Sequence, residues 1–111
     1  MAVRLDKPWQ ALSADGVEEL MGHLGVYQIA DGEGRVVYIG YAGGRSLFGL
    51  KGELREQLAA RGEGFRFRLE VNHQYMSRWE ELLAVHVADH GALPAGNESH
   101  RPRRIGRLSP G

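Results

Sequence analysis

Two tyrosines are among the side chains of this chain whose type and position could support chemistry. Gly25-Val26-Tyr27 opens one β-rich run, and Tyr38-Ile39-Gly40 closes the next. A phenol has an ordinary pKa of about 10, so it serves as a general base only where a cation or a metal-bound water favours the phenolate. Both tyrosines are also explained as half-buried strand residues, which is the usual role of tyrosine in a sheet.

Two carboxylates and two histidines in the last predicted helix could bind metal ions. Glu80 and Glu81 are the carboxylates early in this helix, and magnesium prefers carboxylate oxygens and water. On a helical wheel Glu80 borders the apolar stripe whereas Glu81 points away from it, and a solvated face explains at least one of them. His86 and His90 have the four-residue spacing of a transition-metal pair. For this histidine pair, partial burial with a backbone hydrogen bond is the favoured interpretation.

Composition restricts the classes of function. The 111 residues fit one domain. Lys plus Arg and Asp plus Glu both number 14, so the net charge gives no long-range attraction to nucleic acid or to a membrane, and any phosphate binding needs a local patch. The absence of Cys excludes disulfides, thiolate zinc sites and thiol nucleophiles. Without a signal-like or membrane-spanning stretch, a cytoplasmic protein with no membrane partner is expected.

Hydrophobic spacing predicts the elements that must position these side chains. The fold class expected is α/β in the loose sense (α+β): a small three-stranded, mainly antiparallel sheet flanked by helices. The chain divides into an N-terminal extension with a short helix (1–24), a central domain (25–98) and a basic tail (99–111). The predicted order is a helix over Ser13 to Leu24, a hairpin of Val26 to Ala30 and Arg35 to Tyr41, a helix from Leu47 to Gly62, a strand over Phe65 to Val71, and a helix from Met76 to His90.

The paired tyrosine motifs resemble those of the GIY-YIG nuclease family. The likeness covers roughly residues 25–97: the first motif has Val26 in place of Ile, the second is literal, and Pro94 and Asn97 follow where the family has its own Pro and Asn. The resemblance implies a metal-dependent endonuclease, a hydrolase that cuts phosphodiester bonds of DNA or RNA with Mg²⁺ or Mn²⁺. DNA is favoured over RNA as the partner, and the oligomeric state stays open.

The resemblance also implies roles for individual residues. Tyr27 is the candidate base, Tyr38 orients water or phosphate, and Glu80 or Glu81 holds the metal. Gly25 and Gly40 support the site, as does Asn97, whose amide can tie its loop to the tyrosine hairpin. The residues expected at the site are therefore Tyr27, Tyr38, Arg45, Arg55, Glu80, Glu81, Gly25, Gly40 and Asn97.

The family's phosphate-binding Arg has no direct counterpart. Counting from Gly40 reaches Phe48 and Gly49, so Arg45 and Arg55 are ranked nearly equal for this role. Basic residues of the tail, Arg101, Arg103 and Arg104, could bind nucleic acid, although a solvated terminus explains them as well.

One alternative function uses the same fold without catalysis. A register that aligns Val85 or His86 with the family's metal-binding Glu would remove the carboxylate. The domain would then be a degenerate GIY-YIG fold that binds nucleic acid or protein. A small structural partner domain in a larger assembly is a third possibility.

Overall fold

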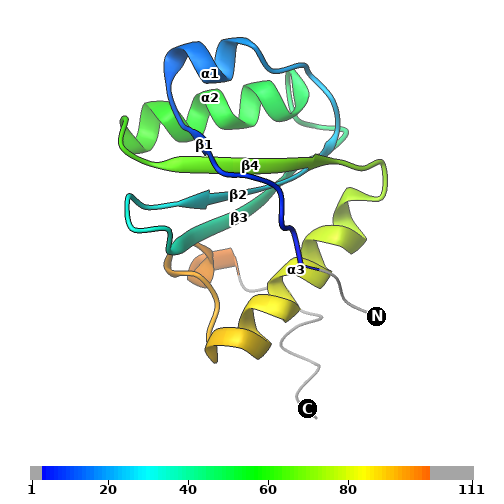
Figure 1. Ribbon diagram of the computed structural model, residues 1–111. Helices are drawn as coiled ribbons and strands as arrows, with labels where there is room; N and C mark the ends of the chain where they lie inside the picture. Colours follow the sequence, from blue (N-terminus) through cyan, green and yellow to red (C-terminus); the bar gives the residue numbers. More distant parts are fainter. Residues whose placement is uncertain (1–3, 101–111) are drawn as a thin grey trace.

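The protein is a three-layer α+β domain in which helices cover both faces of one sheet. The computed structural model describes residues 4–100. Helices α1 and α2 lie on one face of the sheet and α3 lies on the other (Figure 1). The elements in chain order are β1 (Gln10–Ala11), α1 (Ala14–Glu18), β2 (Gly25–Ala30), β3 (Val36–Ala42), α2 (Gly49–Arg61), β4 (Arg66–Val71), α3 (Tyr75–His90) and the 3-10 helix η1 (Ala95–His100).

The sheet has four antiparallel strands in the order β1-β4-β2-β3. The expected class and the three longer strands are confirmed. The fourth strand, β1, comes from the segment expected to be an extension, where Gln10 pairs with Phe67 and Ala11 with Arg66. Two residues are too few to show the alternating pattern that predicts a strand. The strand β1 is defined by its pairing with β4.

The central strand β2 explains why both faces need helices. All six of its residues are buried. Tyr27 and Ile29 belong to the core under α1 and α2, whereas Val26 belongs to the core under α3. Since successive side chains point to opposite faces, β2 has two dry faces and separates two small cores.

Helices α2 and α3 begin and end close to their predicted positions, whereas α1 is shorter than predicted. Ser13 caps α1 by accepting a hydrogen bond from the Gly16 amide at 3.1 Å, as its type predicts. The first helix is nevertheless only five residues long and stops at Glu18. None of the helices within residues 4–100 combines the length and the apolar character that spanning a membrane requires.

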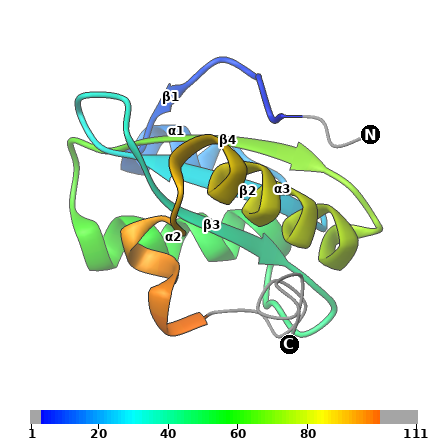
Figure 2. The same ribbon diagram turned by 90° about the horizontal axis from the view of Figure 1, so that it is seen from below.

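The edge strand β3 is where the two helical layers meet. Figure 2 shows β3 between α2 and α3, with η1 beside it. An edge strand leaves backbone groups unpaired on one side. Side chains of α3 and η1 bind the backbone of this edge at Ile39, and α2 packs near the same strand.

Candidate active site

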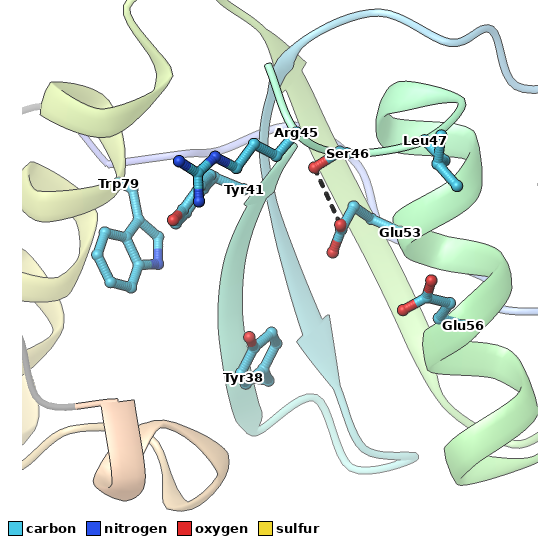
Figure 3. A pocket seen from close by; sticks show the side chains of 8 residues that line it. All are labelled: Tyr38, Tyr41, Arg45, Ser46, Leu47, Glu53, Glu56 and Trp79. Atoms are coloured by element: carbon cyan, nitrogen blue, oxygen red, sulfur yellow. Dashed lines mark hydrogen bonds between the residues drawn. The ribbon is translucent and has the colours of Figure 1, made fainter. Parts of the chain in front are cut away.

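An open cleft of about 480 Å³ follows the edge strand β3 between α2 and α3. Two tyrosines of β3 form its floor, and Figure 3 shows Glu53 and Glu56 facing it from α2 while Trp79 lies opposite, on α3. The loop between β3 and α2 closes one end. The lining residues are Tyr38, Tyr41, Arg45, Ser46, Leu47, Glu53, Glu56 and Trp79.

Glu53 is the centre of a hydrogen-bond chain at this cleft. Its Oε1 accepts from the Tyr27 hydroxyl at 3.3 Å, and its Oε2 accepts from the Ser46 hydroxyl at 3.1 Å. Gln57 donates to the Tyr27 oxygen at 3.3 Å and accepts from Arg61 at 2.8 Å. Both carboxylate oxygens of Glu53 are therefore held in place by neutral donors.

The surroundings of Tyr27 oppose the phenolate that a general base requires. The side chain is 1% exposed, and burial, together with the charges of Tyr38 and Glu53, raises the pKa of Tyr27 well above its usual value. Burial raises the pKa of the Tyr38 phenol as well, and the charge of Glu53 adds to this effect. With ring centroids 6.0 Å apart, the two tyrosines meet as the paired motifs predicted, but both phenols are neutral at neutral pH.

Gly25 and Gly40 are required because backbone or ring atoms lie where a side chain would begin. A Cβ on Gly40 would lie 2.5 Å from the Tyr27 ring and its hydroxyl. A Cβ on Gly25 would lie 2.1 Å from the Glu70 carbonyl oxygen of the neighbouring strand. Gly40 therefore leaves the space that lets Tyr27 pass beneath β3 toward Glu53.

Asn97 ties η1 to the edge of β3. Its Oδ1 accepts from the Ile39 amide at 2.8 Å and its Nδ2 donates to the Ile39 carbonyl at 2.9 Å. The residue is fully buried. The Trp79 indole donates to the same carbonyl at 2.9 Å. The geometry agrees with the expectation that the Asn97 amide joins its loop to the tyrosine hairpin.

Of the two candidate arginines, Arg45 lines the cleft and Arg55 does not. Arg45 extends from the loop toward Trp79 and Tyr41 (Figure 3). Arg55 pairs with Glu18 at 3.8 Å, across the contact between α1 and α2. The alternatives left open by the sequence thus separate, since one cation reaches the cleft and the other pairs with a helix behind it.

Glu80 and Glu81 do not line the cleft with the tyrosines. Glu81 forms an ion pair with Arg78, which also pairs with Glu70 at 3.0 Å. Trp79 is instead the residue of α3 that faces the cleft. The start of α3 therefore contributes an aromatic ring to the cleft, and the Glu81 carboxylate is engaged by Arg78 instead. Arg101, Arg103 and Arg104 lie outside the described residues.

Glu53 and Glu56 are cleft carboxylates that the sequence reasoning missed. A helical wheel contains the signal: Leu50 and Leu54 form the core stripe, and positions 53 and 57 flank it on one side whereas 51 and 55 flank it on the other. Lys51 and Arg55 both pair with Glu18, at 3.5 and 3.8 Å. The remaining flank, with Glu53, is therefore the one that faces the tyrosine hairpin.

The oxygens of the cleft are donors of the kind that a hard divalent cation accepts. Glu53 and Glu56 stand one turn apart on α2, and Ser46 supplies a hydroxyl beside Glu53. Within residues 4–100 no group of three or more His, Cys, Asp or Glu side chains could hold a metal ion. Mg²⁺ nevertheless often binds through one or two carboxylates and completes its shell with water and substrate phosphate. Glu53 and Glu56 are therefore the residues of this cleft that could contribute carboxylate ligands to such an ion.

A family model described as "Domain of unknown function (DUF7508)" matches residues 3–89, which is more than half of the chain. The chain belongs to this family. Its matched span includes β1, the tyrosine hairpin and every residue that lines the cleft. No curated protein and no solved structure matches the chain.

Proposed function

We propose that this DUF7508 domain is a GIY-YIG-like, divalent-cation-dependent phosphodiesterase acting on nucleic acid at the β3 cleft. One observation supports this most: Tyr38, Arg45 and a carboxylate, Glu53, line one cleft. The buried Tyr27 lies behind this cleft and donates a hydrogen bond to Glu53. The carboxylate comes from α2 rather than from the last helix. The proposal therefore keeps the tyrosine hairpin of the family and assigns the acidic role to Glu53.

Charge balance supports a cation in this cleft. Glu53 and Glu56 outnumber Arg45 among the charged residues that line it. A phosphodiester would meet net repulsion from two carboxylates and one guanidinium. A divalent cation held by Glu53 would reverse the sign of the net charge in the cleft, neutralise charge developing on the phosphate and lower the pKa of a bound water.

Other side chains at the cleft could bind the phosphate, accept a proton from water and position Glu53. Arg45 can hold two phosphate oxygens through its planar guanidinium. Tyr38 donates a hydrogen bond from its neutral phenol. Glu56 makes no hydrogen bond or ion pair with another described residue, so its carboxylate is available to accept a proton from water. Tyr27 is a positioning residue that fixes Glu53.

Cleavage of supercoiled, single-stranded and branched DNA, with RNA as a further substrate, tests the proposal. We expect cleavage with Mg²⁺ or Mn²⁺, none with chelator, and a loss of about 100-fold in Arg45→Ala. Arg55→Ala is the matched control and keeps its rate, because Arg55 pairs with Glu18 outside the cleft. Absence of cleavage of every substrate, or equal losses in both variants, would contradict the proposal.

The second candidate is a binding module without catalysis. Tyr41 meets Trp79 edge to face at 5.0 Å and stacks on Tyr75 at 5.7 Å. Such an aromatic wall suits bases of single-stranded nucleic acid. This function predicts binding that Arg45→Ala weakens but no cleavage with either cation.

The expected partner and location are part of the same proposal. DNA is the preferred substrate over RNA, and a cytoplasmic location is inferred. The basic tail, Arg101 to Arg104, adds phosphate contacts in this proposal. Removing the tail should weaken binding and leave the cation requirement unchanged.

A further inference from the structure

A histidine pair at the C-terminal end of α3 lies apart from the cleft. His86 and His90 have ring centroids 4.4 Å apart. Neither residue lines the β3 cleft. Both line a second pocket, of about 260 Å³, between the end of α3, the hairpin turn at Gly34 to Val36 and the loop before η1.

Both imidazoles are open to a ligand. Among the described residues, neither ring makes a hydrogen bond or an ion pair, so the backbone bond favoured by the sequence is not formed. No buried side-chain nitrogen or oxygen in the described part of the chain lacks a partner, which means that the unpaired nitrogens of half-buried His86 reach solvent. The two rings therefore lie close together, and no other described group forms a hydrogen bond or an ion pair with either of them.

The spacing of the rings suits one shared ion. With a nitrogen-to-metal distance of about 2.0–2.1 Å, two imidazoles at the right angle of a square-planar Cu²⁺ or Ni²⁺ ion have ring centroids roughly 4.5 Å apart. At the tetrahedral angle of Zn²⁺ the centroids are roughly 5.2 Å apart. The observed separation is 4.4 Å. The i, i+4 positions on a rigid helix supply this geometry without any movement of the backbone.

The charged residues around the pair are engaged by other side chains. Asp89 is held by Arg4 through two hydrogen bonds, at 2.6 and 2.9 Å. Arg35 in the second pocket lies 3.7 Å from Glu33, and Arg68 lies over the ring of Trp9.

We propose that His86 and His90 bind one divalent transition ion of the class that prefers imidazole: Cu²⁺, Ni²⁺ or Zn²⁺. Magnesium is excluded from this site by its preference for oxygen donors. Two protein ligands leave further coordination positions for water or a small anion. The site is independent of the proposed phosphodiesterase, since it shares no residue with the cleft.

Calorimetric titration of the full chain with Ni²⁺ and with Zn²⁺, in excess Mg²⁺, tests this site. We expect one equivalent to bind, and His86→Gln and His90→Gln each to weaken binding at least about tenfold. The control carries Gln at His23, His73 and His100, the other three histidines of the chain. It should bind like the wild type.

Two results would overturn the site. One is an unmodified chain that binds these ions no more tightly than His86→Gln. The other is a control variant that loses binding while His86 and His90 are intact. Thermal unfolding of each metal-free variant verifies folding, because neither histidine is fully buried and its replacement should change the melting temperature little.

Discussion

Glu53 shows how a side chain with an ordinary helical position becomes the centre of a site. A hydroxyl from β2 and a hydroxyl from the loop before α2 meet its two oxygens. Removing either hydroxyl leaves the carboxylate in the cleft but with one fixed partner fewer. Its position therefore depends on Tyr27 and Ser46 as much as on the helix.

Tyr27 should make the protein less stable in alkali. Its folded pKa lies above the unfolded value of about 10, so the folded chain binds the phenolic proton more tightly. The resulting stabilisation is complete below pH of about 10 and is lost as pH rises toward the folded pKa. Urea unfolding between pH of about 8 and 11 should show a falling midpoint that falls less steeply in Tyr27→Phe. Equal slopes in both proteins would contradict the buried neutral phenol.

At the scale of single residues, the sequence predicted the positions of the tyrosines better than those of the charged residues. The motifs bring Tyr27 and Tyr38 together because a hairpin fixes both positions by local pairing. The choice between Arg45 and Arg55, and the recognition of Glu53, depend on which flank of α2 faces β3. That is a property of helix packing, and a family motif alone does not contain it.

At the scale of elements, the edge strand β3 is completed by a side chain rather than by another strand. Asn97 pairs with the amide and the carbonyl of Ile39 and so covers the edge where η1 crosses it. This also fixes η1 against the floor of the cleft. The function of the tyrosine hairpin thus depends on a residue 58 positions further along the chain.

Asn97→Ala should destabilise the fold by about 1–3 kcal/mol, because the buried Ile39 amide loses its acceptor. Trp79 still donates to the Ile39 carbonyl, which limits the cost. Urea unfolding measures the change, and exchange of the Ile39 amide with solvent should accelerate. Gln74→Ala, at an exposed position, is the control and should change stability by less than about 0.5 kcal/mol. Unchanged protection of Ile39 would contradict the role of Asn97.

Periodicity predicted the long elements and failed for short ones. The stripe of leucines in α2 and the alternation of β4 appear in the sequence because many residues share each pattern. In contrast β1 has two residues, and α1 stops at Glu18, well before the predicted end at Leu24. Their limits follow from tertiary pairing and packing, which local spacing does not encode.

At the scale of the molecule, the N-terminal segment belongs to the domain. Leu5 is 2% exposed and packs in the core under α3, and Leu12 is 1% exposed in the core under α2. The family match begins at residue 3, which agrees with this. The expected division at residue 24 therefore does not coincide with a boundary in the packing.

Removal of residues 1–24 should abolish cooperative unfolding, because each core loses a buried leucine, Leu5 or Leu12. The strand β4 also loses its pairing with β1. The milder change Leu5→Ala should cost about 2–5 kcal/mol. Leu47→Ala removes the same atoms from a side chain that is 79% exposed and should have little effect. Urea unfolding followed by circular dichroism measures all three. A truncated chain with an unchanged midpoint would show that the segment is a separate extension.

The cation-dependent cleavage rate of Glu53→Gln, set against Glu81→Gln, tests the proposed activity most directly. Glu53 lines the cleft beside the tyrosines, whereas Glu81 pairs with Arg78. With Mg²⁺ we expect Glu53→Gln to lose about 100-fold or more and Glu81→Gln to stay within about threefold of the unmodified protein. A Glu53→Gln protein that cleaves at the original rate, or a Glu81→Gln protein that loses as much, would contradict the assignment of the acidic role to α2.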